Sequence, residues 1–238
     1  MIVDRRIFDR FTEWLTVLSR DEVYFLALAA RNKYLTPEER ESFSLGRTEM
    51  FSRQIARDTV GIAYACAKLQ ASLEYRRTKT GLRMPAHALV TYINVNPSSM
   101  TRAYVAFQHE MNEALLAVAR STCADYDPFL QMDRRLLNEV QKATSRKNLV
   151  DIDIDTKEPW VLAELCEFLD AYDVEHATVV THGGYHVLVR KATLGKTKLW
   201  ERLKSLQTRS GAEVCINKNG MVPLPGTMQA GKLVLFDS

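Results

Sequence analysis

The sequence has few cysteines, and none of them lies close to another. Its four cysteines are scattered, and none belongs to a CxxC pair: Cys66, Cys123, Cys166 and Cys215. Zinc knuckles and dithiol redox centres are built from such pairs, so the spacing argues against both classes of site. Isolated thiols of this kind are typical of reduced cysteines inside a hydrophobic core.

The 238 residues also lack a long apolar run, and none of their hydrophobic stretches is long enough to span a bilayer. The first ten residues alternate charged and hydrophobic side chains and lack the apolar block of a secretion signal. Hydrophobic residues still make up 46% of the chain, which is enough for a real core. The sequence therefore predicts an ordered cytoplasmic protein without a membrane partner.

Neither sign of charge dominates, because 32 basic residues stand against 29 acidic ones. The distribution is uneven, since the part from residue 149 onward holds 10 basic and 12 acidic residues, which leaves 22 and 17 before it. A basic part next to an acidic part suits an enzyme of nucleic acids, although ordinary proteins show such splits too.

The first 85 residues predict a helical N-terminal region. Hydrophobic residues recur there at helical spacing, and caps and prolines mark the starts of helices. The predicted helices cover Arg6–Leu18, Glu22–Asn32 with Asp21 as cap, a start at Thr36–Glu39, and one long helix or two over Thr48–Arg76. A basic loop is predicted to follow over Arg76–Arg83.

Residues 86–238 predict a small mixed α/β core, so the fold class is α+β with a sheet that contains antiparallel strands. Short alternating or β-branched segments bounded by turn residues indicate its strands. The predicted strands are 87–95, 149–155, 176–182, 185–190, 212–216 and 233–236, and the predicted helices are 98–120, 128–143, 158–171 and 196–207.

The segment 149–155, Leu-Val-Asp-Ile-Asp-Ile-Asp, alternates hydrophobic residues with aspartates. In a strand, Asp151, Asp153 and Asp155 share one face, about 6–7 Å apart. At an effective dielectric of about 20, neighbouring carboxylates repel by roughly 2–3 kcal/mol. A divalent cation offsets this repulsion, because Mg²⁺ binds one or two carboxylates together with phosphate. The alternative is a solvent-facing edge strand with spare acids.

A second feature is the segment Thr-His-Gly-Gly-Tyr-His at residues 181–186. Its two glycines permit positive φ angles and a close approach of the backbone to a ligand. A histidine fixed just after this turn, His186, is placed to donate to phosphate oxygens, and His182 offers the same from the other arm. For both histidines the alternative is a structural role.

A third acid, Glu213, opens the short predicted strand before the Asn-Lys-Asn-Gly turn at 217–220. A surface glutamate is the default interpretation of this residue when it is considered alone. Its position after the other two features makes it a candidate metal ligand.

Together these features resemble the motifs of the archaeo-eukaryotic primase superfamily, especially its Prim-Pol-like primase-polymerase branch. That superfamily has a hydrophobic run ending in DxD, then a small-x-His motif, then a hydrophobic-acidic motif. Residues 150–155, 181–186 and 213–214 match them in this order, with Glu213 in place of the usual aspartate. The resemblance covers roughly residues 149–230 and implies an RRM-like catalytic core within residues 86–238.

The resemblance also implies roles for particular residues. Two acids of the first motif, Asp153 and Asp155 or alternatively Asp151 and Asp153, would hold two Mg²⁺ or Mn²⁺ ions together with Glu213. The phosphates of a nucleoside triphosphate would contact His186 and the turn that contains Thr181 and Gly184.

The implied activity is that of a DNA primase or polymerase, a nucleotidyltransferase that joins nucleoside triphosphates on a single-stranded DNA template. A helicase, if needed, would be a separate partner. Basic residues at 191–204 and the loop at Arg76–Arg83 would follow the template backbone, and a solvated basic face is the alternative. The rival functions are a replication protein that binds nucleic acid without catalysis, a metal-dependent nuclease or phosphohydrolase, and a purely structural interaction module.

Overall fold

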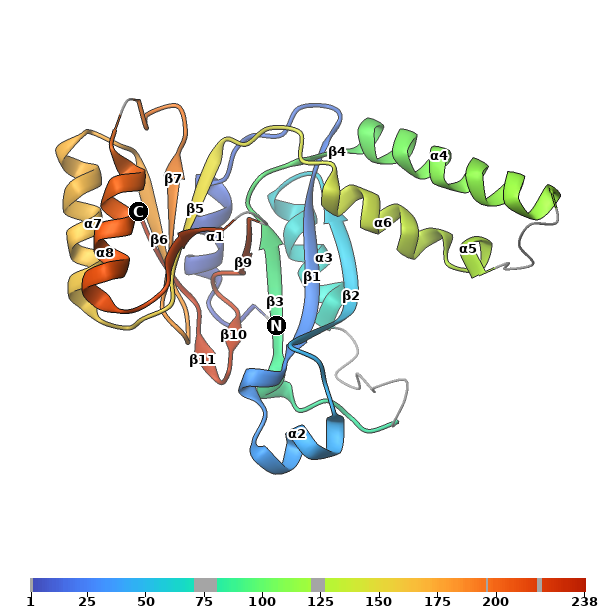
Figure 1. Cartoon of the computed structure of the whole chain (residues 1–238), viewed down its shortest axis with the longest axis horizontal. Coiled ribbons are helices and arrows are strands. Elements are labelled where there is room, and N and C mark those ends of the chain that lie inside the picture. The colour runs from blue at the N-terminus through green and yellow to red at the C-terminus, as the bar shows by residue number, and fades with distance from the viewer. Residues whose placement is uncertain (1, 71–80, 121–126, 196, 218–219) are drawn as a thin grey trace.

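The computed structural model describes residues 2–70, 81–120, 127–195, 197–217 and 220–238. Within these residues, two five-stranded sheets lie side by side, and helices cover their outer faces (Figure 1). Every strand pairing inside the two sheets is antiparallel. This arrangement confirms an α+β fold with antiparallel sheets. None of the described helices has the length and apolar character needed to cross a bilayer.

The first sheet has the order β2-β1-β3-β9, and a short strand, β4, also pairs with β1. Its strands are β1 (Glu22–Arg31), β2 (Thr48–Ala56), β3 (Leu89–Asn94), β4 (Ser98–Ser99) and β9 (Met221–Pro223). The boundary predicted at residue 85 separates a helical N-terminal region from an α/β core. In the structure, β1 and β2 before this boundary and β3 and β9 after it belong to one sheet.

The helix predicted over Glu22–Asn32 is wrong, because this segment is β1, the central strand of the first sheet. Its leucines and alanines favour a helix when considered alone. However, nine consecutive residues of β1 are buried, which is the pattern of a strand covered on both faces. Tertiary packing therefore overrides the local propensity.

The helix predicted over Thr48–Arg76 is wrong in its first part, which forms β2, and correct at α3 (Thr59–Gln70). Residues 71–76 lie outside the described part of the chain, as does most of the basic loop predicted at 76–83. The helix predicted over Arg6–Leu18 is confirmed at α1 (Arg5–Trp14), which ends four residues earlier than predicted. The predicted start at Thr36–Glu39 is confirmed at α2 (Pro37–Phe43), where Thr36 and Glu39 form a capping box. Short 3₁₀ turns occur at η1 (Asn32–Tyr34) and η2 (Ala86–Ala88).

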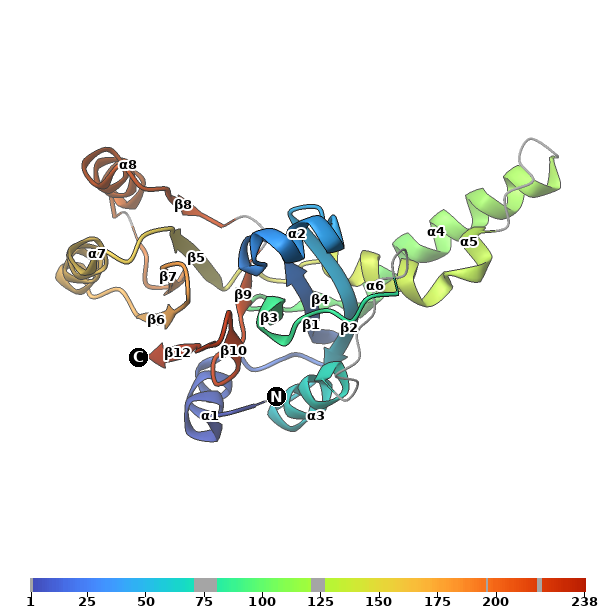
Figure 2. The ribbon, with the colours of Figure 1, turned by 90° about the horizontal axis from the view of Figure 1, so that it is seen from below.

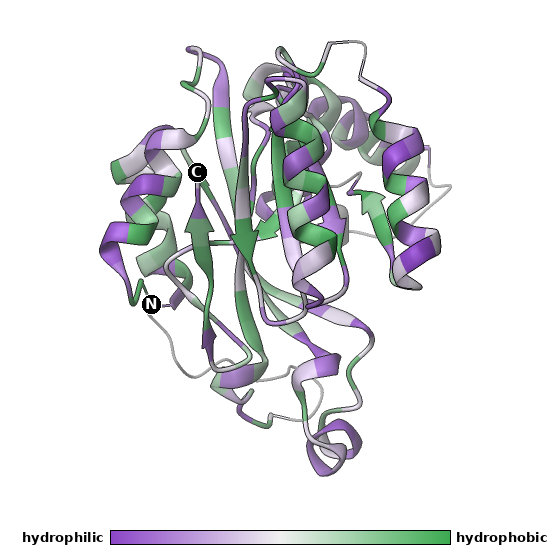
Figure 3. Cartoon of the chain, turned by 90° about the vertical axis from the view of Figure 1, so that its left-hand side faces the viewer, coloured by the Kyte–Doolittle hydropathy of each residue, from purple (hydrophilic) through white to green (hydrophobic). Residues whose placement is uncertain are grey.

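The second sheet has the order β12-β6-β7-β5-β8, and the strands predicted for it are confirmed with small shifts at their ends. They are β5 (Leu149–Ile154), β6 (His176–Val180), β7 (Tyr185–Arg190), β8 (Val214–Ile216) and β12 (Leu235–Asp237). The predicted helices are confirmed as α7 (Pro159–Ala171) and α8 (Leu199–Ser210), which cover its outer face. Figure 3 shows green apolar positions on these helices and strands.

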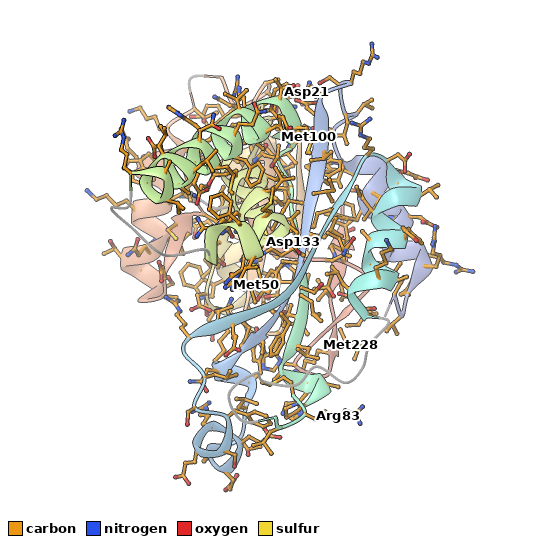
Figure 4. All side chains as sticks on the ribbon, turned by 90° about the vertical axis from the view of Figure 1, so that its right-hand side faces the viewer. Asp21, Met50, Arg83, Met100, Asp133 and Met228 are labelled. Carbon is orange, nitrogen blue, oxygen red and sulfur yellow. The ribbon has the colours of Figure 1, made fainter. Side chains whose placement is uncertain are left out.

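Three helices leave the body of the protein as an arm, seen on the right of Figures 1 and 2. They are α4 (Met100–Ala119), α5 (Asp127–Leu130) and α6 (Met132–Lys142), which confirms the helices predicted there. Asp21, which was predicted to cap a helix after itself, instead accepts hydrogen bonds from Ser99 and Thr101 at the start of α4. Figure 4 shows Asp21 beside Met100 at this junction.

The remaining strands form a small hairpin, β10 (Met228–Gln229) with β11 (Lys232–Leu233). Cys66, Cys166 and Cys215 are free thiols, as the spacing predicts, and Cys123 lies outside the described residues.

One hydrophobic cluster joins the two sheets into a single body. It contains Leu26 and Ile93 from the first sheet and Leu149 and Leu188 from the second, together with Phe11 of α1. Beside it, the buried side chain of Asn96 forms a polar clamp to β5. Its Nδ2 donates to the carbonyl of Leu149 at 2.9 Å, and its Oδ1 accepts from the amide of Leu149 at 2.9 Å. Asn96 therefore fixes the start of β5 against the segment that follows β3.

We expect Asn96→Ala to destabilise the protein by about 2–4 kcal/mol, because it leaves a buried N–H and a buried C=O without partners. Urea unfolding measures this change. Asn112→Ala, on an exposed position of α4, is the control and should change stability by less than about 0.5 kcal/mol. Equal effects of the two substitutions would contradict the clamp.

Candidate functional site

A cleft of about 460 Å³ lies between the two sheets. One wall belongs to the second sheet and carries the acids and the histidine predicted from the sequence. The opposite wall belongs to the first sheet and to the segment that follows β1. The polar, aromatic and glycine residues that line the cleft include Arg31, Lys33, Tyr34, Arg47, Tyr92, Asp153, Asp155, Thr181, Gly183, Gly184, His186, Glu213, Asn217 and Gln229.

The acidic wall is built by three neighbouring strands. Asp153 on β5 lies opposite His186 on β7 and opposite Cys215 on β8. Asp155 follows the end of β5, and its amide donates to the carbonyl of Glu213 at 2.9 Å. The structure therefore brings Asp153, Asp155, Glu213 and His186 together at one end of these strands.

Burial and repulsion act together on the central acid of this wall. Burial raises the pKa of Asp153 above its ordinary value, and the charges of Asp151, Asp155 and Glu213 raise it further, while His186 opposes them. For His186, burial alone would lower the pKa, but Asp151 and Asp153 raise it above its ordinary value. The site therefore concentrates negative charge that a cation or a cationic side chain can offset.

Cys215 lies on β8, two residues after Glu213, and its thiol donates to the Glu213 carboxylate at 3.4 Å. Burial and this hydrogen bond raise the pKa of Cys215 to about 11. The thiol therefore stays protonated near neutral pH, and the carboxylate oxygens are the atoms of this wall that are suited to bind a metal ion.

Asp151 differs from the other acids because its side chain is only 1% exposed, against 44% for Asp153. As the strand alternation predicts, it points to the same side as Asp153, toward His186. One of its oxygens lies 3.0 Å from Nδ1 of His186. Asp151 is therefore a partner of the histidine inside the wall, away from the open cleft.

The turn at residues 181–184 connects β6 to β7 and packs against the end of β5. A Cβ atom on Gly184 would overlap the carbonyl oxygen of Ile154 and lie 2.9 Å from the carbonyl oxygen of Thr156. Neither Gly183 nor Gly184 has a positive φ, so close approach, rather than a left-handed backbone, explains Gly184. Thr181 closes the turn, because its hydroxyl donates to the carbonyl of Gly184 at 3.0 Å and accepts from its amide at 3.1 Å.

His182 lies outside the acidic wall, which favours its structural interpretation. Its ring packs edge-on against Tyr34 with the ring centres 5.5 Å apart, and its backbone amide donates to Gln229 at 2.8 Å. The other end of the Gln229 amide donates to the hydroxyl of Tyr34 at 2.8 Å. Gln229 thus joins the glycine turn, the segment after β1 and the β10–β11 hairpin.

The opposite wall carries positive charge, which the sequence analysis missed. Arg31, Lys33 and Arg47 line the cleft. The ammonium of Lys33 and a carboxylate oxygen of Asp155 lie 3.6 Å and 3.5 Å from the point where a Cβ on Gly183 would stand. Arg31 donates to the hydroxyl of Tyr92 at 3.0 Å, which holds its guanidinium beside the cleft.

A sequence signal for this wall exists, because Arg31-Asn32-Lys33-Tyr34 directly follows the apolar run of β1. Polar residues that follow a buried strand are a frequent feature of binding sites. The helix prediction for this segment hides the signal, since it places these residues on a solvated helix end.

The acids fit a particular kind of metal site. Among the described residues, no group of three or more His, Cys, Asp or Glu side chains is arranged to hold a metal ion alone. Mg²⁺, however, is usually bound by one or two carboxylates that share it with substrate phosphates and water. Asp153, Asp155 and Glu213 are hard oxygen donors on one face, so they fit an ion that arrives with a phosphate ligand.

Comparisons with family models, with curated proteins and with solved structures find no match for this chain. Any inference about the function of the cleft therefore rests on its geometry and charge. The resemblance of the motifs to those of the primase superfamily stays a prediction.

We expect Gly184→Ala to destabilise the protein by about 2–4 kcal/mol, because the added methyl group meets the backbone of β5. Gly183→Ala is the matched control, since its Cβ would stand at ordinary contact distances from Asp155 and Lys33. Thermal unfolding of both variants measures the difference. If Gly184→Ala is as stable as Gly183→Ala, the close approach of the turn to β5 is not required.

Proposed function

We propose that the protein is a metal-dependent nucleotidyltransferase of the primase-polymerase type, which joins nucleoside triphosphates on a single-stranded DNA template. The observation that carries this proposal is the pair of opposed walls in one cleft. Carboxylates and His186 stand on the second sheet, and Arg31, Lys33 and Arg47 stand on the first. A triphosphate with divalent cations carries both signs of charge and therefore complements both walls.

Asp153, Asp155 and Glu213 would hold two Mg²⁺ or Mn²⁺ ions. Such ions, when bound, neutralise phosphate charge and lower the pKa of an attacking hydroxyl group. The protein's own contribution is positioning and electrostatic stabilisation, as in other phosphoryl transfers. Nε2 of His186 lies at the cleft, 3.8 Å from Asp153, where it is placed to donate to a phosphate oxygen.

The basic wall supplies the remaining phosphate contacts. Lys33 offers a point charge beside the glycine turn, and Arg31 and Arg47 offer planar donors from the two ends of the β1–β2 connection. Gly183 has no side chain, so its backbone is open to phosphate oxygens between the two walls.

The cleft also has an apolar part, which suits a nucleobase. Its lining includes Ala27 and Ala29 of β1 together with Met50, Tyr92 and Met221. Apolar and stacking contacts, unlike hydrogen bonds to base edges, tolerate different bases. A template-directed enzyme needs this tolerance, because base pairing rather than the protein selects the nucleotide.

The same proposal assigns each of the two sheets to one half of a primase core. The second sheet, with its helices on one face and the acidic motifs at its edge, would be the RRM-like half of an archaeo-eukaryotic primase core. The first sheet would be the N-terminal α/β half that completes the cleft.

Two rival activities use parts of the same site. A protein that only binds nucleic acid does not need buried carboxylates beside a histidine, since these acids repel the phosphate backbone. A nuclease or phosphohydrolase would use the acids, and release of nucleotides from DNA without added triphosphates would favour it over the polymerase.

We expect Asp153→Asn and Asp155→Asn to lower nucleotide incorporation by about 10²–10³-fold or more, because each removes a charged oxygen donor from the reacting phosphates. Incorporation on primed and unprimed templates in Mg²⁺ or Mn²⁺ is the measurement. Glu167→Gln, at an exposed position of α7, is the control and should keep full activity. Full activity of either aspartate variant would refute the proposed role.

We expect Lys33→Ala and Arg47→Ala each to raise the KM for the triphosphate by about 10–100-fold, since a charge-assisted hydrogen bond contributes about 1.5–3 kcal/mol. Initial rates against triphosphate concentration at low and high salt measure this change. Arg20→Ala, at an exposed position before β1, removes the same kind of charge outside the cleft. An unchanged KM in both cleft variants would place the triphosphate elsewhere.

A further inference from the structure

Asp151 accepts two side-chain hydrogen bonds, one at each oxygen. Its Oδ1 lies 3.0 Å from Nδ1 of His186, and its Oδ2 accepts from Nδ2 of Asn217 at 2.7 Å. Its side chain is 1% exposed, so water and ions have almost no access to it. A carboxylate in this state is poorly placed to bind a metal ion, although its position in the acidic strand suggests a ligand.

Asn217 is held in place by the backbone around it. Its amide donates to the carbonyl of Asp151 at 2.8 Å, and its side chain also lies 3.4 Å from the carbonyl of Met221. Asn217 therefore links the end of β8 to the middle of β5 and to the beginning of β9. The Asp151 carboxylate is fixed by this anchor on one side and by the imidazole on the other.

The consequence for His186 concerns which ring nitrogen faces the cleft. An ionised carboxylate only accepts hydrogen bonds, so Nδ1 must carry the proton that it donates to Asp151. The ring orientation that makes this bond leaves Nε2 on the cleft side, 3.8 Å from Asp153. A carboxylate that accepts from one ring nitrogen fixes the orientation of the imidazole in this way. With Nδ1 donating to Asp151, Nε2 donates to a phosphate oxygen in the imidazolium form, in which both ring nitrogens carry a proton.

We infer that Asp151 is a positioning residue for His186, anchored by Asn217, and that it is not one of the metal ligands. The inference rests on the proposed function, because it specifies how the phosphate-binding histidine of that site is aimed. It also decides the register of the first motif, leaving Asp153 and Asp155 as its two ligands.

A double-mutant cycle tests the inference. Asp151→Asn keeps the shape of the side chain, but an amide both donates and accepts, so it no longer dictates the protonated nitrogen. We expect it to raise the KM for the triphosphate by about 10–100-fold, the usual effect of losing such a partner, with a smaller change in kcat. In a His186→Gln background the same substitution should change KM by less than about 2-fold, because coupled residues are not additive.

Asp155→Asn is the comparison for a direct ligand, and its effect should persist in the His186→Gln background. If Asp151→Asn also keeps its full effect there, Asp151 acts independently of His186 and the inference is wrong. Asn217→Ser offers a second variant that leaves the Asp151 charge in place. It should raise KM in the same direction, and an unchanged KM would overturn the role of the anchor.

A spectroscopic measurement separates this inference from the proposed function. The ¹⁵N chemical shifts of the His186 ring in the free, full-length protein report whether each ring nitrogen carries a proton. We expect a proton on Nδ1 in the unsubstituted protein and a smaller protonated fraction of Nδ1 in Asp151→Asn. An unchanged Nδ1 in the variant overturns the inference. If Nδ1 changes but the unsubstituted protein incorporates no nucleotide, the proposed function fails and the positioning role stands.

Discussion

The site depends on the alternation of side chains along β5. On one side of this strand, Ile152 and Ile154 pack under α7 and α8. On the other side, Asp151 and Asp153 face the first sheet and His186. Because the strand period is two, a shift of one residue would exchange these sets and place carboxylates in the helix-covered core. The hydrophobic cover of the second sheet therefore fixes the acids where they stand.

The electrostatic character of the cleft follows from this placement. The acids are held together by strand pairing, although burial and their mutual repulsion raise the pKa of Asp153. The positive residues Arg31, Lys33 and Arg47 stand on the opposite wall. A site with fixed charges of both signs on facing walls is preorganised for a ligand that itself combines anionic groups with cations.

The sequence predicts the acidic wall well and the basic wall not at all, and the reason is physical. Asp153, Asp155 and His186 belong to local patterns, because strand alternation and a tight turn are determined by neighbouring residues. Lys33 and Arg47 reach the cleft only because the two sheets pack together, which brings them to acids more than 100 positions away in the sequence. The same distinction explains β1, whose local composition favours a helix until burial on both faces is known.

The two sheets also share a late part of the chain. Residues 221–223 form β9 in the first sheet, and residues 235–237 form β12 in the second. Neither sheet is complete until this segment has joined both of them, so the two halves are not independent folding units. Contacts this distant in sequence slow the search for the native state. Folding should accordingly be slow and cooperative, and a fragment lacking this segment should be prone to association through its unfilled sheet edges.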